Sequence, residues 1–398
     1  MKKTKSFPLL AAVAAATALA ATVSVAPAGA ATQRSQAISC SGTLDIGFLT
    51  PLTGAAGFLG QEQISWARLA VKTLPQTMGL KIKLVPGDVP VEAGPSVAQT
   101  VAQKFISDKK MVAVLGPSTS GAAAATSKTF TQAGLVQVSP SATRTTLTKG
   151  NNQEATSAFY RVVPADDYQG PSDADYMIKT LHVKNVVIFD FQEPYSQGLG
   201  GQVEKSLKAA GVTTSHQSVP NNVTDFSQYV TKVPSDADIV FFPTQQPAAA
   251  QTMASQLAEQ GKKAKVFGGD GSNGPGVFKA AGSYVSNFAP QIDTIAADKP
   301  IIAAWKKANP GKSVGSFGPP SYGAVQVILT AIKKACTAGK GSIPKRSAVI
   351  NDMKKVAINT GWILGGKFAW SKINPRDPNT ARFYIMQIQS DGTYKLVD

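Results

Sequence analysis

Short apolar runs alternate with amphipathic stretches along most of the chain. Runs such as Val186–Phe189 are apolar at every position, which is typical of a strand covered by helices on both faces, so we expect parallel sheets. The expected strands are Leu44–Thr50, Lys81–Val85, Met111–Gly116, Leu135–Ser139, Phe159–Val163, Asn185–Asp190, Ile239–Pro243 and Ala264–Gly268. The expected helices cover residues 60–74, 95–107, 121–133, 167–181, 197–210, 247–260 and 321–336.

This alternation predicts an α/β protein. Strand–helix units with Gly, Pro, Ser or Asp at the strand ends build doubly wound sheets with right-handed crossovers. The 398 residues exceed what one compact core holds and suit two lobes. Ligands of such sheets bind beyond the carboxyl ends of the strands, so we look for functional residues there.

The N-terminus has the layout of a secretory signal. Three lysines within the first five residues precede an uncharged run from Phe7 to Ala31, which closes at the small-residue site Ala28-Gly29-Ala30. The alternative is a membrane anchor, but the run is built largely of alanine rather than leucine and isoleucine. We expect a signal peptide at residues 1–30, a linker at 31–42 and an exported protein in the periplasm or at the extracellular cell surface.

Charge and rare residues exclude several functions. Forty Lys and Arg against 24 Asp and Glu give a formal net charge of +16, which is also typical of nucleic-acid-binding proteins. Here the basic residues form scattered pairs such as Lys109-Lys110, as on solvated faces, so we expect no nucleic acid. The sequence has two histidines. His182 follows an expected helix and His216 lies in a polar run, so neither is placed to act as a base for a serine at a strand end. We therefore expect no enzyme, no metal and no cofactor.

Cys40 and Cys336 are the only cysteines. In an exported protein a disulfide between them is the first interpretation. Cys336 also falls on the apolar stripe of the last expected helix, which would suit a buried free thiol. A third interpretation is lipid attachment at Cys40, although a polar stretch separates it from the apolar run.

Two hydroxyl-rich turns follow successive expected strands. The first is Pro117–Gly121, in which Ser120 is a good N-cap for the next helix, whose free amides attract anions. The second contains Ser141 and Thr143. Together they suggest a pocket for a carboxylate or an amide. The alternative is that these hydroxyls only satisfy the local backbone.

Asp270 lies between two glycines just after a third expected strand, Ala264–Gly268. A carboxylate there can point into a cleft while the backbone stays close to a ligand; alternatively it is a local turn acceptor. The glycines at 269, 271 and 274 also match a dinucleotide fingerprint, which we reject because Pro275 follows at once. The glycines at 116 and 121 have P-loop spacing without its lysine, so that site is excluded too.

Six stretches in register resemble the type I periplasmic binding proteins, and within them the leucine/isoleucine/valine-binding family that serves ABC importers. The resemblance spans the whole chain after the signal. The stretches are Ile46–Gly54, Val114–Gly121, Ser139–Thr143, Asp167–Gly170, Tyr195–Leu199 and Gly269–Gly271.

The resemblance implies two Rossmann-like lobes joined by three hinge strands, which close on a ligand between them. It places lobe 1 at residues 43–161 plus 293–365 and lobe 2 at 162–292 plus 366–398. The hinges are expected near Arg161–Pro164, Asn287–Ile292 and Gly366–Ser371.

The resemblance also implies a site for a zwitterion. The hydroxyls of Ser120 and Thr143, with backbone groups near Ser141, would hold a carboxylate. Tyr195 would cover the ligand, and Asp270 would pair with its ammonium group. Opposite charges of a zwitterion need opposite partners.

Two positions depart from the family. Gln245 replaces a frequent second-lobe tyrosine, and Phe58-Leu59 stands where an aromatic residue usually shapes the side-chain pocket. The anchors for an α-amino acid are kept while the side-chain pocket has changed, so a branched-chain or related amino acid is only one expected ligand, and amides, urea-like molecules and aromatic acids are the alternatives.

We expect a monomeric substrate-binding protein that delivers this small-molecule ligand to the permease of an ABC importer. The alternatives are an envelope sensor of the same fold and a secreted serine hydrolase.

Overall fold

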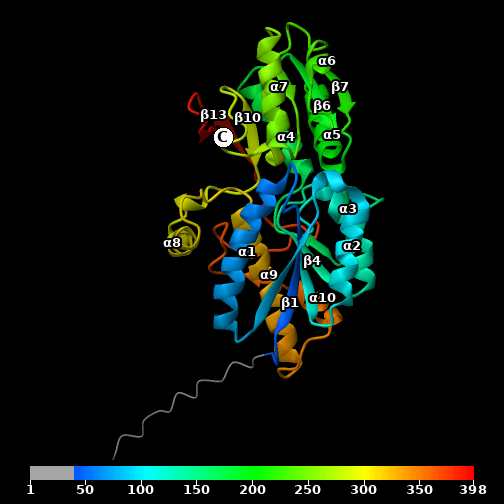
Figure 1. The fold of residues 1–398 in the computed structure, drawn as a ribbon, viewed down its shortest axis with the longest axis vertical. Coiled ribbons are helices and arrows are strands. Elements are labelled where there is room, and N and C mark those ends of the chain that lie inside the picture. Colours follow the sequence, from blue (N-terminus) through cyan, green and yellow to red (C-terminus); the bar gives the residue numbers. More distant parts are fainter. Residues whose placement is uncertain (1–39) are drawn as a thin grey trace, which may run out of the picture. The chain divides into compact units, whose positions relative to one another are not determined.

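The computed structural model describes residues 40–398. The expected signal peptide and residues 31–39 of the expected linker lie outside the described residues. Figure 1 shows two lobes, each a sheet between helices, which confirms the expected fold class. None of the helices in the described part is long and apolar enough to cross a bilayer.

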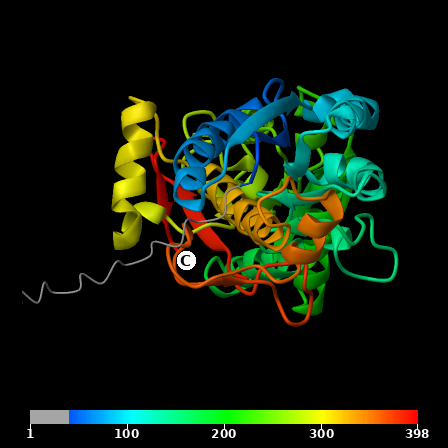
Figure 2. The ribbon, with the colours of Figure 1, turned by 90° about the horizontal axis from the view of Figure 1, so that it is seen from below.

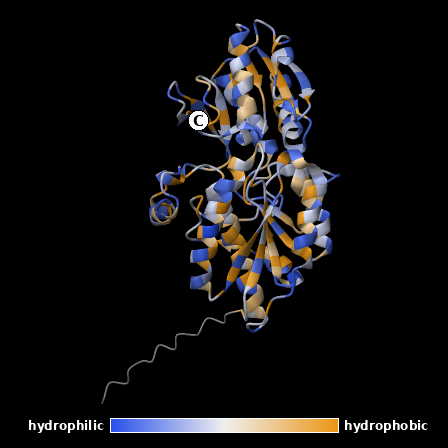
Figure 3. Cartoon of the chain, viewed as in Figure 1, coloured by the Kyte–Doolittle hydropathy of each residue, from blue (hydrophilic) through white to orange (hydrophobic). Residues whose placement is uncertain are grey.

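The first lobe is built on a fully parallel sheet with the strand order β2-β1-β3-β4-β5. Alternate β1 residues face opposite sides, because Ile46 and Phe48 pack with α1 and α9 whereas Leu49 packs with α2 and α3. In Figure 3 these strands are largely orange, as expected for strands covered on both faces. The elements are β1 (Leu44–Thr50), α1 (Gly57–Met78), β2 (Ile82–Asp88), α2 (Gly94–Ser107), β3 (Met111–Leu115), α3 (Ser120–Gln132), β4 (Val136–Ser139), β5 (Phe159–Arg161), α9 (Gly318–Ala338) and α10 (Arg346–Met353).

The second lobe is built on a sheet with the strand order β14-β13-β10-β9-β8-β6-β7. Helices α4 and α5 cover one face, and α6 and α7 cover the other. The strands from β10 to β7 pair in parallel as expected, and the sheet is mixed only at its other edge, where β13 runs antiparallel to both β10 and β14. The elements are α4 (Asp166–Lys179), β6 (Asn185–Phe191), α5 (Pro194–Ala209), β7 (Thr213–Val219), α6 (Ser227–Val230), β8 (Ile239–Phe241), α7 (Pro247–Glu259), β9 (Lys265–Gly268), β10 (Tyr284–Asn287), β13 (Tyr384–Ile388) and β14 (Tyr394–Leu396).

All expected strands are present, and the largest difference is at β2, which continues to Asp88 rather than Val85. The polar run around His216 is the edge strand β7, paired only with β6. His216 does not simply face solvent: its two ring nitrogens lie 2.6 Å from an oxygen of Asp190 and 2.9 Å from one of Glu204. These carboxylates, Asp190 first, raise the pKa of His216.

The chain passes between the two sheets three times. The first crossing follows β5 and the second follows β10, close to the expected hinges. The third lies later than expected. Residues 366–379 are held by the first lobe, where Trp370 packs against Tyr160 with ring centroids 4.8 Å apart, and the chain reaches the second sheet only at β13. The short strands β11 (Ala357–Ile358) and β12 (Phe368–Ala369) precede this crossing.

A buried arginine fastens the third crossing to the first lobe. Arg161, at the end of β5, is fully buried. Its Nε donates to Oδ1 of Asp377 at 2.8 Å, and its Nη1 donates to the carbonyl oxygens of Ala142 and Arg144 at 3.1 and 2.8 Å. One guanidinium therefore joins the turn after β4 to the crossing segment.

Helix α8 (Lys299–Ala308) lies at the edge of the first lobe, and Figure 2 shows it apart from the neighbouring helices α1 and α9. It is anchored through Trp305, whose ring stacks on that of Trp66 in α1 at a centroid distance of 5.1 Å. The indole of Trp305 also donates to the hydroxyl of Ser65 at 3.1 Å. Neither α8 nor α10 was expected from the sequence.

A disulfide joins Cys40 to Cys336 in α9 across a sequence separation of 296 residues. The first described residue is thereby tied to a helix that packs on the first sheet. Because its sulfur is in this bond, Cys40 has no thiol for lipid attachment in this structure.

Reduction of this disulfide should lower the free energy of unfolding by about 2–5 kcal/mol, because the bond constrains the unfolded chain. Chemical denaturation with and without reductant measures the change, and a Cys40→Ala/Cys336→Ala variant, insensitive to reductant, is the control. Two reactive thiols in the denatured, non-reduced protein would contradict the bond.

Candidate functional site

The first-lobe wall of the site is made by the turns that follow β3 and β4. Thr119, not Ser120, is the N-cap of α3: its hydroxyl accepts from the backbone N–H of Ala122 at 3.4 Å. The expected cap at Ser120 is therefore wrong by one residue. The hydroxyl of Ser120 instead accepts from the backbone N–H of Arg144 at 3.2 Å, which joins the two turns.

A buried glutamine from α1 fixes these turns. Oε1 of Gln63 accepts from the hydroxyls of Thr50 and Ser118 at 3.0 and 2.7 Å. Its Nε2 donates at 2.8 Å to the hydroxyl of Ser141, which itself donates to the carbonyl of Ser118 at 2.6 Å. The hydroxyl proton of Ser141 is therefore used within the first lobe and is not available to a ligand. Gln63 was not expected from the sequence, although a polar residue four positions after the buried Leu59 was a signal.

Thr143 is completely buried, and its hydroxyl has no hydrogen-bond partner within residues 40–398. Its carbonyl accepts from the backbone N–H of Asp166, the first residue of α4, at 2.9 Å. An unsatisfied buried hydroxyl costs about 1–3 kcal/mol, so this position is suited to a ligand that supplies the missing partner.

The second-lobe wall is made by Tyr195 in the first turn of α5 and by Asp270 after β9. The Tyr195 hydroxyl donates to Oδ1 of Asp270 at 2.9 Å and accepts from the backbone N–H of Gly271 at 3.0 Å. Gly269 permits this approach, because a Cβ there would collide with the Tyr195 hydroxyl. The structure therefore brings together these two residues, which are far apart in the sequence.

Three buried aspartates lie at the junction of the two walls: Asp166, Asp173 and Asp270. Burial, and then the charge of Asp270, raise the pKa of Asp166 to about 8. Burial raises the pKa of Asp270 to about 6 against the opposing effect of the Tyr195 hydrogen bond, and burial raises that of Asp173 well above its usual value. Within the described residues none of the three forms a salt bridge.

Asp166 was missed by the sequence analysis. Neither of its carboxylate oxygens has a hydrogen-bond partner within the described residues. The backbone N–H of Asp166 donates to the carbonyl of Thr143, so the two residues lie side by side. Asp166 also lies close enough to Asp270 for the charge of Asp270 to raise its pKa. The sequence feature that could have identified Asp166 is that it is an acidic residue directly after the first crossing between the lobes.

The remaining candidates differ in position. Leu59 is buried in the first-lobe core, and it is the neighbouring Phe58 that approaches the second lobe near Gly274. Gln245 lies on the second-lobe wall, where its Nε2 donates at 3.1 Å to Oε2 of Glu193. Glu193 caps α5 by accepting from the backbone N–H groups of Tyr195 and Ser196, and burial raises its pKa to about 7.

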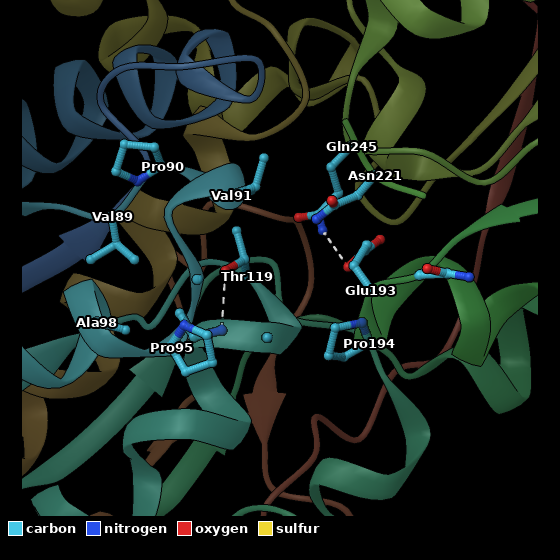
Figure 4. A pocket seen from close by; sticks show the side chains of 14 residues that line it. Val89, Pro90, Val91, Pro95, Ala98, Thr119, Glu193, Pro194, Asn221 and Gln245 are labelled. Atoms are coloured by element: carbon cyan, nitrogen blue, oxygen red, sulfur yellow. Dashed lines mark hydrogen bonds between the residues drawn. The ribbon is translucent and has the colours of Figure 1, made fainter. Parts of the chain in front are cut away.

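A pocket of about 260 Å³ separates the walls beside these residues. In Figure 4 Glu193 and Gln245 lie on one side of it and Pro90 and Pro95 on the other. The walls meet nearby, where the Arg144 guanidinium donates to the carbonyl of Pro194. Within residues 40–398 no group of three or more acidic, histidine or cysteine side chains is placed to hold a metal ion.

Asp166→Asn should remove a pH dependence of stability. Because the folded protein holds this proton more tightly than the unfolded chain, its contribution to stability is fully present below the ordinary carboxyl pKa of 3.8, falls as pH rises from there, and is lost once the pH passes the folded pKa of about 8. We expect the variant to be more stable than the wild type above that pH, by about 1 kcal/mol or more. Urea denaturation between about pH 6 and pH 9 measures this difference.

The matched control is Asp391→Asn. Asp391 is exposed, and its hydrogen bonds with Thr393 lower its pKa, so it does not titrate in this range. Parallel pH profiles for the wild type and Asp166→Asn would show that Asp166 is ionised throughout.

Comparison with known proteins places this arrangement in a family. The sequence matches the periplasmic binding protein family over residues 43–393. An amino acid binding protein of Pseudomonas aeruginosa is 28% identical over 302 residues, covering 73% of this chain and 78% of that protein.

Two solved structures share the fold. A leucine binding protein, LivK from Thermotoga maritima, has a TM-score of 0.78 and 20% identity, covering 89% of this chain and 98% of that one. A solute binding protein from R. palustris in complex with benzoate has a TM-score of 0.74 and 19% identity, covering 89% and 96%. The resemblance of the sequence motifs is confirmed, and this chain belongs to the periplasmic binding protein family.

Proposed function

We propose that this protein is the exported substrate-binding component of an ABC importer and that it captures a small α-amino acid between its lobes. The observation that carries the proposal is that hydroxyl donors and buried carboxylates lie side by side. Ser120 and Thr143 offer hydroxyl donors on the first-lobe turns, and Asp166 and Asp270 offer buried carboxylates next to them. An α-amino acid, whose ammonium and carboxylate groups are also adjacent, has a partner for each kind of group.

The carboxylate of the ligand would bind at the first-lobe turns. The Ser120 hydroxyl uses its oxygen to accept from Arg144, so its proton is free to donate. The Thr143 hydroxyl makes no hydrogen bond of standard geometry within the described residues, although it lies close enough to the Asp166 carboxyl to lower the pKa of that group. Both lie near the N-terminus of the 13-residue helix α3, whose dipole favours an anion.

The ammonium group would bind between Asp166 and Asp270. Asp166 contributes two oxygens without hydrogen-bond partners, and Asp270 is held in place by Tyr195. A cation there offsets the desolvation that raises the pKa of both carboxyls and the charge of Asp270 that further raises the pKa of Asp166. Because one end of the ligand binds the first lobe and the other binds the second, binding favours the closed arrangement.

The relatives support an amino acid over an aromatic acid. The Pseudomonas relative is named an amino acid binding protein and the Thermotoga structure a leucine binding protein. The R. palustris structure binds benzoate, so the fold alone does not select the ligand. An aromatic acid has no cation for Asp166 and Asp270, so these buried carboxyl groups would have to stay protonated or remain uncompensated. An amide or urea-like ligand lacks the cation as well.

Catalysis is not part of the proposal. His216 is engaged with Asp190 and Glu204 in the second lobe and is not hydrogen-bonded to a serine. We propose a monomer that releases its ligand to a membrane permease; an envelope sensor of the same fold is the alternative.

Asp270→Ala should abolish amino-acid binding, because the ligand's ammonium group loses a buried charged partner while the Tyr195 hydroxyl loses its acceptor. Isothermal titration calorimetry with a panel of amino acids measures binding, and the exposed Asp225→Ala is the matched control. Unchanged affinity in Asp270→Ala would rule out the zwitterion site.

Ser120→Ala combined with Thr143→Ala should raise the dissociation constant about tenfold or more, since each lost hydrogen bond to a charged group costs about 1.5–3 kcal/mol. Thr252→Ala is the control, because its hydroxyl lies on an exposed face of α7 and bonds only its own helix. Normal binding by the double variant would place the carboxylate elsewhere.

A further inference from the structure

The pocket between the lobes adjoins the proposed amino-acid site on both walls. Thr119 and Gly121, which line it, flank Ser120 in the sequence. On the opposite wall Glu193 and Pro194 immediately precede Tyr195. At about 260 Å³ the pocket is several times the roughly 30 Å³ that a water molecule occupies in the liquid, so it has room for a side chain.

The two walls of the pocket differ in chemistry, as Figure 4 shows. The first-lobe wall is apolar apart from Thr119, whose hydroxyl already caps α3. The second-lobe wall carries amides and a carboxyl group. The apolar side chains are Val89, Pro90, Val91, Pro95, Ala98 and Ala122, and the polar ones are Gln192, Glu193, Asn221 and Gln245.

The amides of the polar wall retain hydrogen-bonding capacity. Within the described residues the side chains of Gln192 and Asn221 make no hydrogen bond, and Gln245 uses only its Nε2, in the bond to Glu193. Donors and acceptors are therefore both available on this wall. An aliphatic ligand group would leave the free amide atoms of the buried Gln245 and the half-buried Asn221 without partners, whereas Gln192 is exposed to solvent.

Glu193 argues against a charged ligand group. Its carboxylate oxygens already accept from Tyr195, Ser196 and Gln245, which leaves about one of the four acceptor positions of a carboxylate and suits a single N–H donor better than an ammonium group with three. An anion would meet the charge of the same carboxylate. An uncharged group with both donor and acceptor, such as a primary amide, fits this wall.

We propose that this pocket is a distal subsite that receives the ligand's side chain and selects an extended chain ending in an uncharged amide. The inference rests on the proposed function, because the α-amino and α-carboxylate groups are held by the neighbouring site. The methylene groups of the side chain pack against the prolines and valines of the first lobe. Its amide bonds Gln192, Asn221 and Oε1 of Gln245.

The test compares ligands that share the same α-amino acid part. Calorimetry on the purified protein measures dissociation constants for alanine, glutamine and homoleucine, whose side chain has the shape of glutamine's without its amide. We expect glutamine to bind at least about tenfold more tightly than either, which corresponds to 1.4 kcal/mol. Asparagine and citrulline, with shorter and longer reach, locate the depth of the amide contact.

Two variants connect the preference to the pocket. Gln192→Ala with Asn221→Ala should bring the glutamine and homoleucine dissociation constants together, because these side chains make no internal hydrogen bonds that folding would lose. Val91→Trp should fill the pocket and lower the glutamine-to-alanine affinity ratio about tenfold. Val277→Trp, at a position 45% exposed and outside the pocket, is the matched control.

The outcomes separate the two proposals. If alanine, homoleucine and glutamine bind equally well, the distal subsite is wrong while the amino-acid site stands. If none of the tested amino acids binds, the proposed function fails and the subsite fails with it. An unchanged affinity ratio in Val91→Trp would place the side chain outside this pocket.

Discussion

Buried negative charge at the junction of the lobes is the constraint on which the site depends. Asp166 and Asp270 are both buried, and their charges interact, yet neither forms a salt bridge within the described residues. Such groups either hold a proton or require a cation. The raised pKa values mean that these carboxyl groups tend to hold a proton, and a bound ammonium group would supply the cation instead. A site built this way favours ligands that bring positive charge into the fold.

The two walls contribute in different ways. On the first lobe Gln63 and the hydroxyls around it form a buried network that fixes two turns, while Ser120 and Thr143 keep donors free. On the second lobe Tyr195 orients Asp270, and the flanking glycine leaves room for the ring. Preorganised groups lose little entropy on binding, so specificity rests on the chemistry of the pocket beside them.

Much of the fold was predictable because its strands are apolar on both faces, as in β6. The edge strand β7 was not, since its exposed positions are polar and carry no burial signal. The antiparallel β13 and β14 follow a loop-rich region without the strand–helix alternation used to infer parallel sheets. In the candidate site, turn chemistry at strand ends was the signal for Ser120, Thr143 and Asp270, whose role in binding stays a proposal. Gln63 and Asp166 depend on packing between segments distant in the sequence, and the choice of Thr119 over Ser120 as cap depends on backbone geometry that composition does not encode.

The position of Arg161 gives the crossing segment an influence on recognition. Its guanidinium bonds the carbonyls on either side of Thr143 and, at the same time, the carboxylate of Asp377. If the lobes rotate when the ligand binds, a shift of that segment would be transmitted through a rigid planar group to Thr143, in the turn that we propose binds the ligand. Substitutions in the C-terminal crossing segment, remote from the ligand, would then change the affinity for the ligand. Natural variation in this segment could therefore alter ligand affinity without any change in the residues that contact the ligand.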